Sequence, residues 1–234
     1  MKILSVIPAR GGSKGIKHKN LQEISGKPLI VHTIEASRSS KLVNRTVVST
    51  DDPKIADVAK KHNADVPFMR PSEYATDTAK SIDVALHALA KCSAIFGECY
   101  DLLVLLQPTS PFRKAKHIDE ALLLLMEDSN ADSLISVREV ANDCHPHYVY
   151  SINESNRCSP FIGSTAIRRR QDLPSAFVRN GAIYAVKSKY LQQHRRLISE
   201  YNIAYRMTNE DSINIDTELD LTLARSLVSK KVKR

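Results

Sequence analysis

A short segment near the start of the chain combines glycines with basic side chains, the residue types that bind phosphate groups. Gly11, Gly12 and Gly15 fall within five residues. Glycine lets a backbone take positive φ angles and approach a ligand closely, and cations beside such a backbone favour polyphosphate binding. The basic side chains of the segment are Arg10, Lys14, Lys17 and Lys19. The segment predicts a polyphosphate site, with an ordinary glycine-rich turn as the alternative.

The spacing of these glycines excludes two well-known nucleotide-binding loops. Residues 7–21 contain neither the G-x-x-x-x-G-K-[ST] pattern of a P-loop nor the G-x-G-x-x-G pattern of a dinucleotide fold. A buried strand is expected over residues 1–7, and Pro8 is expected to end it because proline cannot donate a ladder hydrogen bond. The sequence therefore indicates a different nucleotide-binding loop, placed directly after a strand.

A second candidate segment offers amide and hydroxyl groups. Gln107, Thr109 and Ser110 follow residues 102–106, a continuous apolar run typical of a central strand covered on both faces. Open parallel sheets bind ligands outside the carboxyl ends of their strands, so these side chains are candidates for substrate contact. The alternative is an ordinary turn into the next helix.

Asp216 is the third candidate, and two roles are open to it. Its carboxylate can accept backbone N–H groups at the start of a final helix. It can also be a ligand of Mg²⁺ carried by a nucleotide, because Mg²⁺ prefers oxygen ligands.

The elements needed to position these residues alternate between strand and helix. Strands are expected over residues 1–7, 45–49, 102–106 and 133–137, where apolar and β-branched residues concentrate. Helices are expected from Pro28, from Pro53 after an Asp52 cap, over 81–94 and around 118–125. This order predicts an α/β fold with a mostly parallel central sheet flanked by helices.

The regular alternation stops at about residue 139 and resumes at about residue 179. Residues 139–179 are interpreted as an inserted arm, with a hairpin formed by 148–152 and 159–162. Beyond it, Asn180-Gly181 is expected to turn into a strand over 181–186, followed by a helix over 191–201 and a strand over 203–206. The final helix is expected to be capped by Thr217 with Asp220. The apolar face expected for that helix is Leu219, Leu223 and Leu227.

Length and composition predict one globular domain, residues 1–234, that includes the arm. The chain is 42% hydrophobic and has no apolar run near the about 20 residues that span a bilayer, so no membrane association is expected. The apolar run before Pro8 is too short for a signal-peptide core, which favours a cytoplasmic location. The four cysteines lack metal-site spacing and are expected to be free thiols.

The net charge of +8 indicates an anionic partner, either a nucleotide or a nucleic acid. Much of the charge lies in residues 230–234, interpreted as a solvated tail, and in the clusters 168–170 and 195–196. No aromatic residues interleave these clusters to stack bases. A small anionic substrate is therefore favoured over nucleic acid.

Several motifs together resemble the acylneuraminate cytidylyltransferases, also called CMP-sialic acid synthetases. The first is residues 8–20, which match P-A-R-x-G-S-K-G-x-x-x-K-N closely. The further motifs occur in the family's order and cover nearly the whole chain: S-T-D at 49–51, R-P at 70–71 with A-T-D-T at 75–78, L-L-Q-P-T-S-P-F-R at 105–113, R-Q-D-L-P at 170–174, N-G-A-I-Y at 180–184 and S-I-N-I-D-T-E-L-D at 212–220.

This resemblance implies a Rossmann-like nucleotidyltransferase fold and a specific reaction. Members of the family transfer CMP from CTP to the anomeric hydroxyl of a nonulosonic (sialic-type) acid and release pyrophosphate, with Mg²⁺ as cofactor. The resemblance also implies a homodimer, in which the arm crosses to the second subunit and helps to complete its sugar site.

The resemblance assigns roles to individual residues of this chain. The residues implied to bind the nucleotide are Ala9, Arg10, Gly11, Gly12, Ser13, Lys14, Lys19, Asn20, Arg70, Thr76, Asp77 and Ser81. The residues implied to bind the sugar are Gln107, Thr109, Arg170, Gln171, Arg179, Asn180 and Tyr184. Asp216 and Asn214 are the implied metal ligands. Arg10, Lys19 and Asp216 are the implied catalytic residues, with Lys19 at the α-phosphate, while Lys17 and His18 are assigned to the solvated side of the loop.

The chain departs from the family pattern at two positions. Asn214 stands where the family has the first of two aspartates, which keeps a carbonyl ligand but removes one negative charge. Val178 stands where many relatives have arginine, and Arg179 follows it. Arg170 and Arg179 are therefore the candidates for gripping the substrate carboxylate, with a surface salt bridge as the alternative for either. For Tyr184 the alternative to contact with the sugar is packing in the core.

Other functions remain open from the sequence. A cytidylyltransferase for the eight-carbon sugar Kdo is the nearest enzymatic alternative, although residues 169–174 and 180–184 fit the acylneuraminate branch better. A noncatalytic nucleotide-binding protein is an alternative of another class, which Lys19 and Asp216 argue against. The sequence does not distinguish among N-acetylneuraminic, legionaminic and pseudaminic acids, and it identifies no general base.

Overall fold

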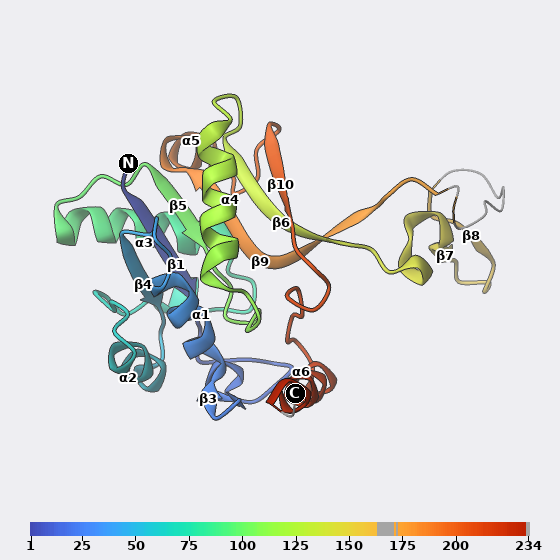
Figure 1. Cartoon of the computed structure of the whole chain (residues 1–234), viewed down its shortest axis with the longest axis horizontal. Helices are drawn as coiled ribbons and strands as arrows, with labels where there is room; N and C mark the ends of the chain where they lie inside the picture. The colour runs from blue at the N-terminus through green and yellow to red at the C-terminus, as the bar shows by residue number, and fades with distance from the viewer. Residues whose placement is uncertain (163–170, 172, 233–234) are drawn as a thin grey trace.

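The computed structural model describes residues 1–162, 171 and 173–232, which are built around a six-stranded sheet with the order β10-β6-β9-β5-β1-β4 (Figure 1). Its strands are β1 (Ile3–Pro8), β4 (Arg45–Ser49), β5 (Leu102–Leu105), β6 (Ser133–Glu139), β9 (Phe177–Lys187) and β10 (Asn202–Arg206). Only β9 is antiparallel to its neighbours, and the other five strands run in one direction. The predicted mostly parallel sheet is confirmed, and β5 lies in its interior.

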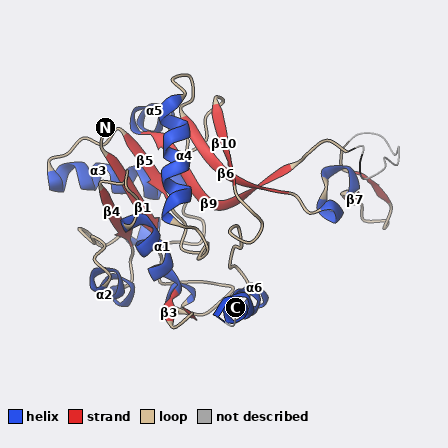
Figure 2. Ribbon diagram, in the orientation of Figure 1, coloured by secondary structure: helices blue, strands red, loops and turns tan. Residues whose placement is uncertain are grey.

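Helices cover both faces of the sheet, as Figure 2 shows. The helices are α1 (Leu29–Arg38), α2 (Pro53–Lys61), α3 (Ser81–Phe96), α4 (Ala115–Glu127), α5 (Ser188–His194) and α6 (Glu218–Val232). Side chains alternate along β1, so that Ile3 and Ile7 join the cluster packed by α1 and α4, whereas Leu4 and Val6 join the cluster packed by α3 and α5. None of the described helices is both long and apolar enough to cross a membrane.

The remaining elements are short. Two strands pair as a hairpin before α1, β2 (Glu23–Ile24) and β3 (Lys27–Pro28). The short turns of 3-10 helix bounded within the described ranges are η1 (Lys19–Leu21), η2 (Ser72–Tyr74), η3 (Asn142–Cys144) and η4 (Pro146–Tyr148). A third apolar cluster joins this region to α6, because Ile16 and Ile24 pack with Leu221. The first loop is thereby fixed to the last helix of the chain.

Strand β1 ends at Pro8, as predicted, although Pro8 is its last residue; β5 pairs with β1 only as far as Val6 and needs no N–H from Pro8. Two predicted helix boundaries are wrong. Pro28 precedes α1 instead of lying within its first turn. The helix expected over 191–201 is α5, which ends at His194 because Arg195 has a left-handed backbone (φ 50°).

Asn180-Gly181 is not the turn that the sequence predicts. Both residues lie inside β9, where the pairing with β6 shifts register between Ile135 and Val137. Gly181 has φ +75°, a conformation that favours glycine. The dipeptide therefore forms an irregularity within one long strand, of the kind that re-aims side chains beside functional sites.

The predicted apolar face of α6 is also wrong. Leu219 is 76% exposed and Leu223 is 50% exposed, whereas Leu221 and Ala224 are buried against the third cluster. A spacing of four residues places side chains on one side of a helix, but it does not determine whether that side faces the core or the solvent. The predicted cap is confirmed, because the Thr217 backbone N–H donates to Asp220 Oδ2 (2.8 Å) and the Asp220 N–H donates to Thr217 Oγ1 (3.3 Å).

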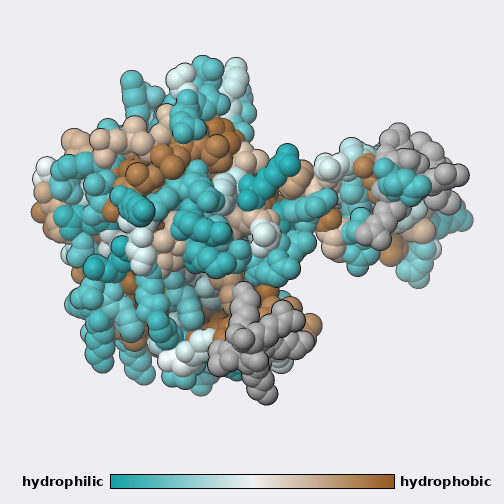
Figure 3. All heavy atoms as spheres, in the orientation of Figure 1, coloured by the Kyte–Doolittle hydropathy of each residue, from teal (hydrophilic) through white to brown (hydrophobic). Residues whose placement is uncertain are grey.

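The predicted hairpin lies in an arm between β6 and β9. Strands β7 (Tyr150–Ile152) and β8 (Cys158–Pro160) pair antiparallel there, and Figure 1 shows the arm extending away from the sheet. Figure 3 shows it as a separate lobe with both polar and apolar side chains on its surface. The large apolar side chains exposed on the arm are Tyr148, Val149, Tyr150, Ile152, Phe161 and Ile162.

Candidate functional site

The strand directions bring distant segments to one edge of the sheet. The carboxyl ends of β1, β4, β5 and β6 meet there because these strands run in the same direction. Strand β9 runs the opposite way, so its beginning, with Arg179 and Asn180, reaches the same edge. Two adjoining cavities open at this edge, which is where open parallel sheets bind ligands.

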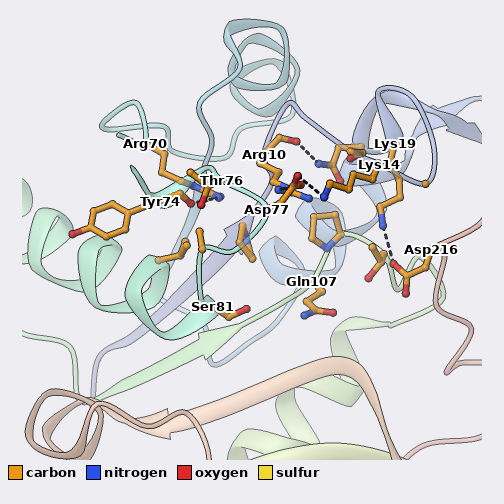
Figure 4. Close-up of a pocket in the computed structure, with 18 residues that line it drawn as sticks. Arg10, Lys14, Lys19, Arg70, Tyr74, Thr76, Asp77, Ser81, Gln107 and Asp216 are labelled. Atoms are coloured by element: carbon orange, nitrogen blue, oxygen red, sulfur yellow. Dashed lines mark hydrogen bonds and ion pairs between the residues drawn. The ribbon is translucent and has the colours of Figure 1, made fainter. Parts of the chain in front are cut away.

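The first cavity, of about 430 Å³, lies over the ends of β1 and β5. It collects most of the nucleotide-binding residues predicted from the sequence, as Figure 4 shows. Its wall consists of Pro8, Arg10, Ser13, Lys14, Gly15, Lys19, Asn20, Arg70, Tyr74, Thr76, Asp77, Ala79, Ser81, Val84, Gln107, Pro108, Thr109 and Asp216.

The first loop is held in place by one anchor at each end and by a close contact between them. Asn20 is buried and donates a hydrogen bond from Nδ2 to the carbonyl of Arg10 (3.0 Å). Gly15 lies directly against the backbone carbonyl of Asp216, where a Cβ atom would collide with that oxygen. The expectation of positive φ angles at the loop's glycines is wrong, since none of the three has one, whereas His18 does (φ 51°). At Gly15 the glycine is needed for a close approach between two segments.

Two of the loop's cations share one carboxylate. Arg10 Nη1 lies 2.7 Å from Asp77 Oδ1, and Lys14 Nζ lies 2.8 Å from Asp77 Oδ2. Figure 4 shows Asp77 between these two side chains. Hydrogen bonds from Lys14, and then from Arg10, lower the pKa of Asp77. Arg10 and Lys14 thus already bind one anionic group, so their arrangement suits the binding of an anion.

The third cation of the cavity pairs with the C-terminal segment. Lys19 Nζ lies 2.8 Å from Asp216 Oδ1, and Asn214 donates from Nδ2 to the other oxygen of that carboxylate. The backbone N–H of Ile215 donates to the carbonyl of Thr109 (2.9 Å). Residues 214–216 are therefore held between the first loop and the loop after β5, and Lys19 and Asp216 meet although 197 positions separate them.

Arg70 serves mainly to build the wall opposite these cations. Its guanidinium donates to the side chain and the carbonyl of Ser49 and to the carbonyl of Tyr74. Burial lowers the pKa of Arg70 to about 10. Since Ser49 is the last residue of β4, Arg70 fixes the segment with Tyr74 and Thr76 to the sheet edge.

A second buried arginine fixes the loop after β5. Arg113 donates to the carbonyls of Gln107 (3.1 Å) and Ala182 (2.7 Å) and to the Thr33 hydroxyl (2.6 Å), and burial lowers its pKa to about 9. Within the described ranges the Thr109 hydroxyl is buried without a hydrogen-bond partner. A buried hydroxyl of this kind on a cavity wall suits a polar ligand.

The second cavity, of about 590 Å³, adjoins the first. The Gln107 side chain lies on the wall of the first cavity and touches Gly181 on the wall of the second. Asn214 faces the second cavity, and its hydrogen-bond partner Asp216 faces the first. The wall consists of Arg138, Ala141, Arg179, Asn180, Gly181, Tyr184, Asn209, Ser212, Ile213, Asn214, Asp220 and Leu223.

The predicted site residues distribute between the two cavities. Twelve of them line the first cavity: Arg10, Ser13, Lys14, Lys19, Asn20, Arg70, Thr76, Asp77, Ser81, Gln107, Thr109 and Asp216. Four line the second: Arg179, Asn180, Tyr184 and Asn214. Lys17 and His18 are exposed outside both walls, as expected.

Some predicted residues lie away from the two walls. Ala9 is buried in the core, and the Gly11 N–H donates to Asp51 Oδ1 (2.9 Å). Gly12 faces open space, Gln171 is exposed on the arm, and Arg170 lies outside the described residues. The flanking glycines shape the loop rather than line the cavity, which spacing along the sequence does not reveal.

Asn180 reaches the second cavity with its polar atoms already engaged. Its Oδ1 accepts from the Ser136 hydroxyl (2.5 Å), and its Nδ2 donates to the Ser212 hydroxyl (2.8 Å). Because it is buried and joins three segments, Asn180 supports the wall. Tyr184 is only partly buried and lines the cavity, so its side chain is available to a ligand.

Two wall residues lie outside every quoted motif. Tyr74 lines the first cavity, and Arg138 lines the second. Arg138 is at the carboxyl end of a predicted strand, the position that identified the loop after β5, and the same argument could have found it.

The residues around Asp216 fit a hard cation that retains other ligands. Within the described ranges the Asn214 amide oxygen is buried without a hydrogen-bond partner, and it lies beside the Asp216 carboxylate. No group of three or more histidine, cysteine, aspartate or glutamate side chains in those ranges could hold a metal alone. One carboxylate and one amide oxygen match the few protein ligands that Mg²⁺ takes when phosphates supply the rest.

A mostly parallel sheet with a cationic cavity at its carboxyl edge defines a nucleotide-binding α/β protein. Comparison with known families identifies the family within this broad class. Residues 4–231 match the family described as "Cytidylyltransferase", and the chain belongs to that family.

Individual relatives agree with this assignment. The N-acylneuraminate cytidylyltransferase of Escherichia coli O18:K1:H7 is 33% identical over 98% of this chain, which spans about half (53%) of that relative. The CMP-N,N'-diacetyllegionaminic acid synthase of Legionella pneumophila is 35% identical, with 97% of each chain covered. A structure of CMP:2-keto-3-deoxy-manno-octonic acid synthetase complexed with CTP has a TM-score of 0.75, 20% identity and coverage of 99% of this chain and 100% of that one. This last likeness shows the shared fold.

The shared carboxylate leads to a first prediction. Asp77→Asn is expected to lower the KM for CTP about two- to fivefold, because an exposed ion pair competes only weakly with an incoming phosphate. KM measured at constant ionic strength checks this. Asp83→Asn removes a carboxylate from an ion pair of similar length, with Arg195, outside the cavity wall, and should leave KM unchanged. A higher KM in Asp77→Asn would show that Asp77 orients the cations for phosphate instead.

The stability of the folded chain is expected to depend on pH through His87, which lies beside Tyr74 of the cavity wall. His87 packs between Phe68 and Tyr74 with both ring nitrogens buried and unpartnered in the described ranges, and burial lowers its pKa. Lys91 and Arg70 lower it further, while Glu73 opposes them. Below the unfolded pKa of about 6.5 the unfolded chain takes up a proton that the folded chain resists. Stability should therefore decline as the pH falls below that value.

Thermal unfolding at pH 5 and pH 7.5 tests this second prediction. His87→Phe keeps an aromatic ring in the same contacts and removes the titrating group, so its Tm should fall less between the two pH values than that of the wild type. Equal losses in both proteins would mean that His87 does not carry the pH dependence.

Proposed function

We propose that the protein transfers CMP from CTP to the anomeric hydroxyl of a nonulosonic acid, releasing pyrophosphate and forming the CMP-sugar. One observation carries the proposal: a cavity lined by Arg10, Lys14 and Lys19 adjoins a second cavity lined by arginines and Tyr184. The first suits a triphosphate and the second an acidic sugar. Relatives named for N-acylneuraminate and diacetyllegionaminate chemistry support an acceptor of this class.

The proposed chemistry is an in-line displacement at the α-phosphorus. The anomeric oxygen forms a bond to phosphorus, the bond from phosphorus to the bridging oxygen of the β-phosphate breaks, and the hydroxyl proton passes to water. Because phosphoryl transfer depends mainly on positioning and charge stabilisation, the cations are the main contributors from this chain. In this proposal Arg10 and Lys14 bind the departing β- and γ-phosphates, and Lys19, where the cavities meet, binds the α-phosphate.

Mg²⁺ dependence is part of the proposal. Asp216 and Asn214 would hold the ion against the phosphates, where it would neutralise phosphate charge and lower the pKa of a bound water. The unpartnered oxygen of Asn214 beside the Asp216 carboxylate supports these ligands. A site with one carboxylate fewer than an aspartate pair should bind the ion more weakly. Asn214→Asp is therefore expected to reach half-maximal activity at a lower Mg²⁺ concentration than the wild type.

The proposed assembly is a cytoplasmic homodimer formed through the arm. The described part of the arm exposes six large apolar side chains away from its own sheet, an arrangement typical of a surface that packs on a partner. In this arrangement the described residues of each arm lie close to the second cavity of the other subunit. Sedimentation velocity of the full chain distinguishes monomer from dimer.

The direct test incubates the purified protein with CTP, Mg²⁺ and one acid at a time, with pyrophosphate release as the readout. The acids are N-acetylneuraminic, legionaminic and pseudaminic acid, with Kdo included. Release with a nonulosonic acid supports the proposal, and release with Kdo alone would favour the eight-carbon alternative. CTP binding without release in any mixture would favour a noncatalytic nucleotide-binding protein.

A further inference from the structure

We propose that Arg138 and Arg179 together form the site in the second cavity that binds the carboxylate of the acceptor. This inference rests on the proposed function and identifies a specificity-determining residue, Arg138, that no motif marks. The two arginines lie on adjacent antiparallel strands at the sheet edge where the cavities open.

The second cavity takes one arginine from each of two paired strands, β6 and β9. Arg138 is opposite Val178 and Val137 is opposite Arg179, immediately beyond the register shift. In a regular ladder, successive residues point to opposite faces of a sheet. Residues 137–139 pair regularly with residues 177–179, so alternation alone places Arg138 and Arg179 on opposite faces; both nevertheless line the second cavity, next to the irregularity at Gly181.

Neither guanidinium has a charged partner among the described residues. Arg138 donates a hydrogen bond to the Glu139 carbonyl (3.3 Å), and neither arginine forms an ion pair in those ranges. Asp220 is the acidic side chain of the wall. It accepts from the backbone N–H and the hydroxyl of Thr217 (both 2.8 Å), so its charge serves the start of α6. The wall therefore presents two positive charges free for an anion.

A planar carboxylate is the anion that this arrangement favours. A guanidinium grips a carboxylate with two parallel hydrogen bonds. The triphosphate has its own cations, Arg10 and Lys14, in the other cavity. In such an acid the carbon bonded to the carboxylate also carries the anomeric hydroxyl, so an acid held at Arg138 and Arg179 presents that hydroxyl from the second cavity toward its junction with the first, at Asn214 and Gln107.

The test compares Arg138→Gln with the wild type in the pyrophosphate assay. The KM for the acid is expected to rise about 10- to 100-fold, the loss typical of a charge-assisted hydrogen-bond pair, while the KM for CTP stays unchanged. Arg206→Gln is the matched control, because Arg206 pairs in register with Val137 on the next strand and stacks on Phe177 without lining the cavity. Arg138→Lys should recover part of the loss.

A neutral analogue separates carboxylate binding from a general effect on the arm. The C1 amide of the acid is measured as a competitor, and Arg138→Gln should change its inhibition constant little. An unchanged KM for the acid, or an equal loss for acid and amide, would overturn the assignment while leaving the proposed function intact. A wild-type protein that releases pyrophosphate with no acid would instead contradict the proposed function and this site together.

Discussion

Lys19→Ala is expected to lower kcat for pyrophosphate release by about 10²- to 10³-fold, the loss typical of removing one preorganised donor from a developing charge. The Lys19 side chain is only 17% exposed, and its ammonium lies 2.8 Å from Asp216 where the two cavities meet. In the proposed reaction a charge at this position acts on the phosphate under attack. The proposal assigns the outer phosphates to Arg10 and Lys14, which the variant retains, so the KM for CTP should change much less than kcat.

Two further variants show whether the loss reflects the position of the charge. Lys17→Ala removes a cation of the same loop that is exposed outside the cavity wall, and its kcat should equal that of the wild type. Lys19→Arg keeps the charge but replaces a compact ammonium by a planar fork, so its kcat should be intermediate. Normal turnover in Lys19→Ala would exclude any role of this residue at the α-phosphate.

The fold was largely predictable because its signals are local. The apolar runs of β1 and β5 and the Asp52 cap of α2 each reflect a few neighbouring residues, and the structure contains all of them. The errors concern properties that neighbours do not determine. Gly181 forms a bulge only because β6 lies beside it, and Leu219 faces outward only because Leu221 packs against the first loop.

The candidate site was predictable in its residue types but not in its contacts. Basic residues after β1 and an acidic residue before α6 are visible along the chain. Their arrangement depends on pairs that are distant in sequence, such as Asp77 between Arg10 and Lys14. Arg138 was missed for the same reason, since its importance depends on sharing a cavity wall with Arg179, which is on another strand.

The contact between the first loop and the C-terminal segment explains why Lys19 reaches Asp216 at all. Ile16 is buried in the cluster that holds α6, and Gly15 beside it lies against the Asp216 carbonyl. Ile215 is fixed on its other side by the Thr109 carbonyl (2.9 Å). Because residues 214–216 are held on both sides, they cannot move away easily if the loop becomes larger at Gly15.

Gly15→Ala is therefore expected to reduce both stability and activity. The added Cβ would collide with a backbone oxygen, and relieving the collision must separate Lys19 from Asp216. Overpacking of this kind costs about 1–3 kcal/mol of unfolding free energy, and a displacement of about 1 Å at a catalytic group can lower kcat about 10²-fold. Gly12→Ala is the matched control, since a Cβ there has no atom within 4 Å and should leave both quantities unchanged. Denaturant unfolding and steady-state kinetics measure the two effects, and equal behaviour of the two alanine variants would mean that the loop does not need the close approach at Gly15.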